Sequence, residues 1–216
     1  YVNPFIGTGA VNGSSLSGNN FPGATVPFGM VQLSPDTKET PDWTACSGYN
    51  HNDKFIYGFS HTHLSGTGVA ELFDITIMPF STEKNFPIRS SFSHEQESAK
   101  PGYYQVKLLD DNINAELTAT THTGFHKYTF AKDSAEYLLI DLNHSIQKGS
   151  WDCRIIGAQI RMLDNRTIEG YRLITGWAPL RKVYFYAEFS RPVITNKMIS
   201  GNTVYNNQSV INGTDV

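Results

Sequence analysis

Two histidines, His61 and His63, lie in a glycine- and hydroxyl-rich segment in the first half of the chain. If this segment is a strand, residues i and i+2 point to one face, and the two imidazoles could act together. Imidazole nitrogens bind zinc, but a zinc site needs a third protein ligand, for which the sequence offers His51, His94 and Asp74. None of these has a spacing that demands a metal, so we expect no metal site in this chain.

The residues around these histidines are typical of a sugar-binding site. Aromatic rings stack on the apolar faces of pyranose rings, while hydroxyls, amides and imidazoles bind sugar hydroxyls. The same rings also fill β-sandwich cores, and we favour that interpretation for Phe59. Trp43 lies between the polar residues Asp42 and Thr44, so we expect it to face the site.

Carboxylates that could catalyse glycoside hydrolysis are harder to identify. Such hydrolysis usually needs a general acid and a second carboxylate on either side of the scissile bond. Glu71 and Asp74 are the best-placed pair, but their spacing does not show whether they converge. The sequence has no Gly-x-Ser-x-Gly elbow, no phosphate-binding Gly-x-x-x-x-Gly-Lys loop and no Gly-x-Gly-x-x-Gly at a strand-helix junction. The residues alone therefore predict a polar and aromatic ligand site without an assigned reaction.

The elements that position these residues are predicted to be β-strands. Apolar and polar residues alternate over 104–108 and 113–119, on either side of the polar turn 110–112, which predicts a hairpin. A third run covers 124–130, and 137–142 is apolar enough to predict a strand buried on both faces.

Farther along, Val183, Phe185, Ala187 and Phe189 are expected on one face of a strand, with its other face polar or tyrosine-rich. No segment has the apolar periodicity of a helix, and no repeat occurs at a fixed period. We therefore predict an all-β fold, an antiparallel β-sandwich that forms a single domain over residues 1–216.

Composition sets further limits. With 216 residues, 39% of them hydrophobic, the chain can bury a sizeable core. The net charge of −3 and the scattered basic residues make nucleic acid a poor candidate partner. No apolar run is long enough for a transmembrane segment. The chain begins at Tyr1 and ends in a polar stretch, 211–216, so we expect a leader to have been removed or absent and further sequence to follow.

Several segments resemble, in order and spacing, the start of glycoside hydrolase family 92. The most specific is the stretch from Gly58 to Gly68. The resemblance covers most of the chain and includes Asn3–Gly9, Phe21–Asp36, Cys46–Tyr49, Asp74, Pro79, Pro101–Tyr104, Ala115–Thr120, Gly124–Phe130 and Gly176–Ala178.

The resemblance implies an exo-α-mannosidase that acts on mannose-rich glycans, depends on calcium and inverts the anomeric centre. It implies a galactose-mutarotase-like super-sandwich, followed in the family by a C-terminal (α/α)₆ catalytic domain. The general acid, the general base and the calcium ligands are then expected on that second domain, so we expect no catalytic residue and no cofactor in this chain and expect it to be inactive alone. Enzymes of this type are usually periplasmic, exposed at the cell surface or secreted.

The matching positions are expected to line the sugar pocket or the seam between domains, and to bind rather than transfer protons. They are Trp43, Cys46, Gly48, Tyr49, His61, Thr62, His63 and Ser65.

Two alternatives remain open from the residues themselves. A stand-alone carbohydrate-binding module would explain the aromatic-rich loops and the lack of a catalytic constellation. A small metal-dependent or mutarotase-like enzyme would use His61 and His63.

Overall fold

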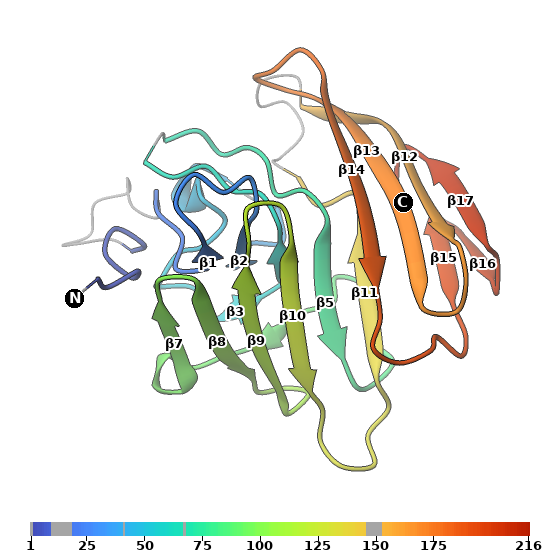
Figure 1. Ribbon diagram of the computed structural model, residues 1–216, viewed down its shortest axis with the longest axis horizontal. Helices are drawn as coiled ribbons and strands as arrows, with labels where there is room; N and C mark the ends of the chain where they lie inside the picture. Colours follow the sequence, from blue (N-terminus) through green and yellow to red (C-terminus); the bar gives the residue numbers. More distant parts are fainter. Residues whose placement is uncertain (1, 10–18, 41, 67, 146–152) are drawn as a thin grey trace. The chain divides into compact units, whose positions relative to one another are not determined.

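The computed structural model describes residues 2–9, 19–40, 42–66, 68–145 and 153–216, which form short β-strands joined by turns (Figure 1). The strands are, in chain order, β1 (Ala24–Thr25), β2 (Gln32–Asp36), β3 (Phe55–Ile56), β4 (Gly58–Ser60), β5 (Thr76–Phe80), β6 (Ser90–Ser91), β7 (Glu97–Lys100), β8 (Tyr103–Leu108), β9 (Ile113–Ala119), β10 (Gly124–Thr129), β11 (Tyr137–Asp141), β12 (Arg154–Met162), β13 (Thr167–Thr175), β14 (Arg181–Glu188), β15 (Lys197–Ser200), β16 (Thr203–Asn206) and β17 (Val210–Gly213).

Helical structure in the described residues is limited to two 3₁₀ helices, η1 (Trp43–Ala45) and η2 (His94–Gln96). The all-β prediction is therefore confirmed. Neither helix has the length or the apolar character that a membrane crossing requires.

Internal contacts divide the chain into two compact units. Unit 1 comprises residues 1–140 and 144–146, and unit 2 comprises residues 141–143 and 147–216.

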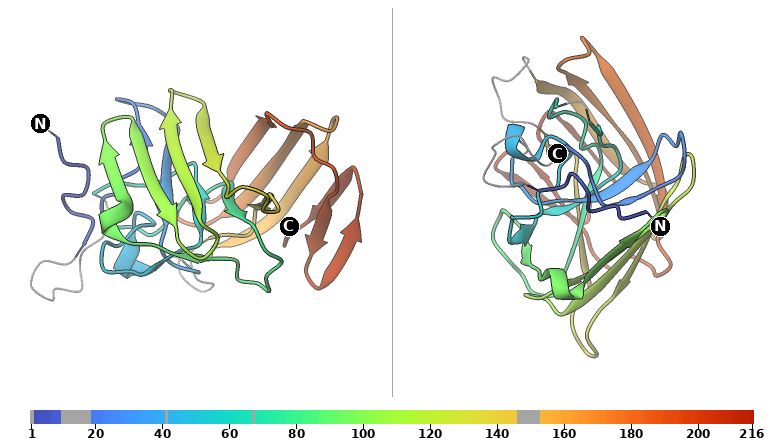
Figure 2. Two further views of the ribbon diagram at one scale, coloured as in Figure 1. Left: turned by 90° about the horizontal axis from the view of Figure 1, so that it is seen from below. Right: turned by 90° about the vertical axis from the view of Figure 1, so that its left-hand side faces the viewer.

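Unit 1 is built from two antiparallel sheets. One has the strand order β1-β2-β4-β5-β11 and the other the order β10-β9-β8-β7, while β3 pairs with β6. Figures 1 and 2 show β7 to β10 as one layer that faces β1 and β2. This is a sandwich, as the alternating sequence predicts.

The core of unit 1 lies between these two layers. Leu33, Phe59 and Met78 come from the first sheet, and Val106 and Leu117 come from the second; all five are almost completely buried. Burial of each such side chain stabilises the fold by about 1.5–3 kcal/mol. The assignment of Phe59 to the core is confirmed.

The predicted hairpin is β8 and β9, in which Val106 lies opposite Ala115. The predicted burial of 137–142 on both faces is wrong for β11. Tyr137 and Leu138 are 38% and 41% exposed, and β11 is the edge strand of its sheet.

Unit 2 contains a sheet with the strand order β14-β13-β12-β17 and the separate pair β15-β16. On β14, Val183 is buried while Tyr184 and Tyr186 are exposed, so the predicted alternation along this strand is confirmed.

Candidate functional site

Trp43 lies on a turn whose backbone is held by its neighbours. Asp42 caps η1, because its Oδ1 accepts from the Thr44 amide at 2.7 Å and from the Thr44 hydroxyl at 2.5 Å. The Asn50 side-chain amide donates to the Thr44 carbonyl at 2.6 Å, and the Cys46 thiol donates to the Trp43 carbonyl at 3.2 Å. Trp43 is 41% exposed, so part of its ring remains accessible on a fixed backbone.

Cys46 supports this turn and is not placed to react. Burial raises the pKa of its thiol, and the nearby charge of Asp42 raises it further. The thiolate is the nucleophilic form, so a thiol that stays protonated is inert at neutral pH.

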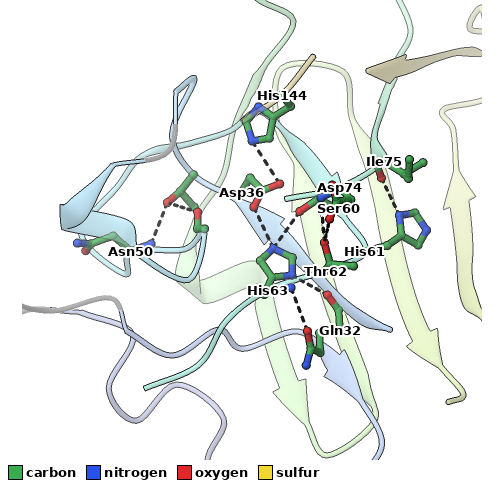
Figure 3. Close-up of polar contacts among 12 residues, drawn as sticks. Gln32, Asp36, Asn50, Ser60, His61, Thr62, His63, Asp74, Ile75 and His144 are labelled. Atoms are coloured by element: carbon green, nitrogen blue, oxygen red, sulfur yellow. Dashed lines mark hydrogen bonds and ion pairs between the residues drawn. The ribbon is translucent and has the colours of Figure 1, made fainter. Parts of the chain in front are cut away.

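His63 forms a fully buried ion pair with Asp36 (Figure 3). Its Nδ1 lies 2.6 Å from the carbonyl oxygen of Gln32, and its Nε2 lies 3.0 Å from Asp36 Oδ1. Both oxygens can accept a hydrogen bond, so each ring nitrogen of His63 faces an acceptor inside the protein. The Ser60 hydroxyl lies 3.0 Å from the same Nε2.

Gly48 packs directly against this pair. Its φ of +88° is in the left-handed region that favours glycine. A Cβ at this position would lie 2.3 Å from Asp36 Oδ1 and 3.0 Å from His63 Nε2. Glycine is therefore required both by the backbone conformation and by the close approach of the ion pair.

Thr62 and Asp74 join the histidine segment to the segment that folds back along it. The Thr62 hydroxyl donates to Asp74 Oδ2 at 2.7 Å and accepts from the Asp74 amide at 3.0 Å. The His61 amide donates to the Asp74 carbonyl, and the Phe73 amide donates to the Thr62 carbonyl, both at 2.9 Å. These contacts define how the two segments align.

The returning segment has an unusual backbone. Leu72, Phe73 and Ile75 have φ values of +91°, +57° and +57°. Such conformations cost about 1–3 kcal/mol each for residues other than glycine, and they persist where surrounding contacts over-determine them. Strain of this kind is common in binding and catalytic segments.

His61 belongs to a chain of hydrogen bonds between neutral rings. Its Nδ1 donates to the Ile75 carbonyl at 2.7 Å, which leaves Nε2 as an acceptor 3.0 Å from Nε2 of His126. His126 Nδ1 in turn lies 2.7 Å from the Tyr128 hydroxyl. Burial lowers the pKa of both histidines, that of His126 strongly, so both rings are neutral at physiological pH.

The pairing of His61 with His63 that a continuous strand would allow does not occur. Strand β4 ends at Ser60, so the two-residue alternation of a strand does not extend to these histidines. They bind different partners, Asp36 for His63 and His126 for His61.

In the part of the chain that the structure describes, one group of three potential metal donors lies together: His51, His94 and Glu97, with donor atoms within 4.8 Å of one another. The two imidazole rings are stacked, with centroids 3.8 Å apart and planes at 16°. An ion bound to an imidazole lies near the plane of the ring, and two nearly parallel planes do not meet at one ion. Glu97 already accepts from Tyr49 at 3.0 Å and from Tyr104 at 2.6 Å, so we assign this group no metal.

Calcium does not fit this group either. It takes six to eight oxygen ligands, whereas the group offers two imidazoles and one carboxylate that is already hydrogen-bonded.

Tyr49 is fully buried, and its hydroxyl is hydrogen-bonded to Glu97 of this group. Burial, followed by the charge of Glu97, raises the pKa of its phenol, so the hydroxyl remains a donor to that carboxylate.

Ser65 is exposed and fastens its loop to an earlier one. Its hydroxyl donates to Asn20 Oδ1 at 2.9 Å, and the Gly66 amide donates to the Asn19 carbonyl at 2.6 Å.

The eight predicted residues thus all lie in unit 1, but they do not form one cluster. Trp43 and Ser65 are exposed and His61 and Thr62 are half-buried; the buried members are Cys46, Gly48, Tyr49 and His63. Residues that the sequence does not single out, above all Asp36 and Glu97, hold the buried members in place. Whether any of the eight contacts a sugar remains a prediction.

The carboxylates considered for catalysis are buried. In this chain, Asp74 has no exposed surface and Glu71 is 4% exposed. Asp74 has a structural role in this chain, since it forms two hydrogen bonds with Thr62.

Comparison with known proteins agrees with this fold. The family model described as the glycosyl hydrolase family 92 N-terminal domain matches residues 1–216. Among solved structures, the family GH92 α-mannosidase BT3965 of Bacteroides thetaiotaomicron, solved in complex with mannoimidazole, has a TM-score of 0.79 and 34% sequence identity. That match covers 100% of this chain and 30% of the mannosidase.

Two further relatives extend the comparison. The family GH92 inverting mannosidase BT2199 of the same organism has a TM-score of 0.78 and 26% identity, over 99% of this chain and 28% of that protein. An uncharacterized secreted glycosidase of Arthroderma benhamiae is 30% identical over 158 residues, which cover 66% of this chain and 19% of the relative. The chain thus spans less than a third of the length of each of these relatives. By its sequence and its fold, the chain belongs to glycosyl hydrolase family 92 and corresponds to the N-terminal domain of that family.

Proposed function

We propose that this chain is the N-terminal part of a calcium-dependent, inverting exo-α-mannosidase that acts on mannose-rich glycans. In this proposal the chain supplies part of the wall of the sugar pocket. The general acid, the general base and the calcium ligands come from sequence outside residues 1–216.

The observation that carries the proposal is the contrast between the exposed ring of Trp43 and two fully buried carboxylates of unit 1. The indole is 41% exposed on a turn braced by Asp42 and Asn50, whereas Asp36 and Asp74 have no exposed surface. A partly exposed aromatic ring on a fixed backbone suits stacking on a sugar. Buried carboxylates with hydrogen-bond partners suit support of the loops.

Family membership supports the substrate class. Two solved relatives are described as α-mannosidase and inverting mannosidase, and one of them was solved with mannoimidazole. An inverting enzyme holds its two carboxyl groups roughly 6.5–9.5 Å apart to admit a water molecule. Calcium would hold oxygen atoms of the sugar and of the protein beside that water.

We also propose an extracytoplasmic location, periplasmic, at the cell surface or secreted. This proposal rests on the Arthroderma relative, which is described as secreted.

Replacement of the indole tests the proposed sugar contact. In the full-length protein, Trp43→Ala should raise KM for an aryl α-mannoside about five- to tenfold, since an aromatic contact contributes about 0.5–1.5 kcal/mol beyond its buried area. Trp43→Phe should recover part of the loss. Steady-state kinetics measure both effects.

A matched control is Phe125→Ala, which removes another exposed ring of unit 1 from strand β10. Its KM should equal that of the wild type. An unchanged KM for Trp43→Ala would refute the proposed contact.

A further inference from the structure

The two exposed residues predicted to contact the sugar, Trp43 and Ser65, lie on separate loops, and both loops are tied to the buried ion pair of Asp36 and His63. Each side chain of the pair has no exposed surface. The pair can therefore act only through other residues of the chain.

The first connection runs from Asp36 to the turn that carries Trp43. The next residue along the chain, Thr37, donates its amide to the Gly48 carbonyl at 2.8 Å, and its hydroxyl accepts from the Asn50 amide at 2.8 Å. The Asn50 side chain holds the Thr44 carbonyl at 2.6 Å.

Gly48 strengthens this connection. Its α-carbon packs so close to the pair that an added Cβ would lie 2.3 Å from Asp36 Oδ1, and its amide donates to the Ala45 carbonyl of η1 at 2.8 Å. A shift of the pair would therefore displace the turn.

The second connection runs from His63 to the loop that carries Ser65. The His63 ring is held by the Gln32 carbonyl, and its backbone amide donates to Gln32 Oε1 at 3.0 Å. The ring also packs 5.2 Å from Phe21 and edge-on to Phe73 at 5.8 Å, measured between centroids. His63, two residues before Ser65, is thus held by Gln32 and by two aromatic rings, and Figure 3 shows its contacts with Gln32 and Asp36.

A buried ion pair is a poor source of stability, because the desolvation of both charges offsets their attraction. Its best-attested use, found in some proteins, is to select one arrangement among several. Here the arrangement is the mutual placement of two loops.

We propose that Asp36 and His63 are positioning residues for the sugar site. They fix the turn of Trp43 and the loop of Ser65 relative to each other and do not touch the substrate. This inference rests on the proposed function and adds to it the residues that make the pocket wall rigid.

The test uses steady-state kinetics of the full-length protein on an aryl α-mannoside. Single neutralisation would leave an unpaired buried charge and could prevent folding. The main variant is therefore the double substitution Asp36→Asn with His63→Gln, which removes both charges and keeps hydrogen-bonding groups. It should raise KM about tenfold and change kcat less than about twofold, the pattern expected when binding alone is lost.

A milder variant, Thr37→Val, removes the hydroxyl that links the pair to Asn50 and leaves the charges in place. It should raise KM about threefold. This variant keeps the proposal testable if the double variant does not fold.

The decisive step repeats each substitution in a Trp43→Ala background. If the pair acts through Trp43, the two losses overlap, and the combined variant should have a KM within about twofold of Trp43→Ala alone. If the two increases in KM multiply in the combined variant, the losses are independent and the proposal is overturned. An unchanged KM in a folded double variant would also overturn it.

Asp111→Asn serves as the control for general destabilisation. Asp111 is buried in unit 1, and its side chain binds Ser81 and Lys84, which belong to neither loop. Its KM should remain at the wild-type value, and an equal rise in KM would show that the pair has a purely structural role. Failure of the proposed function is distinguished by Trp43→Ala alone: if that variant is silent, the sugar contact is wrong, and positioning through Trp43 falls with it.

Discussion

At the scale of single residues, the site depends on close contacts between groups that are far apart in sequence. Asp36 and His63 are 27 positions apart, and Tyr49 and Glu97 are 48 apart. Composition and local spacing indicated the aromatic and imidazole side chains, but they contain no information about which distant carboxylate each one meets. For that reason His63 and Tyr49 could be predicted from the sequence, whereas their partners Asp36 and Glu97 could not.

Gly48→Ala should destabilise the protein because it combines two penalties. The left-handed backbone costs about 1–2 kcal/mol for a residue with a Cβ, and the collision with Asp36 adds to this cost. Urea unfolding of the purified protein measures the loss. Gly66→Ala is the matched control, since its φ of +73° is similar but nothing lies within 4 Å of its added Cβ. Equal losses in the two variants would contradict the contact with the ion pair.

The neutral pair of His61 and His126 predicts an acid-sensitive stability. Burial lowers the pKa of both rings in the folded state, so below pH 6.5 the unfolded chain binds protons that the folded chain does not. Stability should therefore fall as the pH falls below 6.5, by about 1.4 kcal/mol per pH unit for each histidine. His126→Gln should make the slope of unfolding free energy against pH shallower by about this amount. A slope identical to that of the wild type would contradict the neutral assignment.

At the scale of elements, the alternation of side chains was sufficient to predict the hairpin of β8 and β9 and the two faces of β14. It was not sufficient for β11. An apolar run is buried on both faces only if other elements cover both faces of the sheet at that strand, and such packing is a long-range property. The alternation that a strand would give His61 and His63 is also absent, because β4 ends one residue before His61.

The turn after β8 offers a test of how elements are joined. Asp111 accepts from the Ser81 amide at 3.0 Å and from the Ser81 hydroxyl at 3.1 Å, and it pairs with Lys84. Burial tends to raise the pKa of this carboxyl, but the bonds from Lys84 and Ser81 outweigh it and the net shift is downward, so the ionised form stabilises the fold at neutral pH. Asp111→Asn should cost about 1–3 kcal/mol.

Urea unfolding at neutral pH measures this cost. Asp110→Asn, on the exposed neighbour that binds Ser91, is the matched control and should cost less. A larger loss for Asp110→Asn would contradict the role of Asp111 as the link between β5 and β9.

At the scale of the whole molecule, we propose that this chain binds the sugar and that proton transfer belongs to sequence outside it. Positioned acids and bases, with electrostatic stabilisation of the transition state, supply most of the rate of an enzyme. Sugar-binding loops without them should retain affinity and lose turnover. The family resemblance, read from motifs such as Gly58–Gly68, indicated this division, and the burial of Asp36 and Asp74 supports it.

The most direct test is the turnover of an aryl α-mannoside by residues 1–216 expressed alone, beside the full-length protein. Far-UV circular dichroism first establishes that the isolated chain is folded and β-rich. The account predicts hydrolysis by the full-length protein and no hydrolysis above the buffer rate by the folded fragment. Turnover by the fragment at a rate comparable with the full-length protein would contradict it.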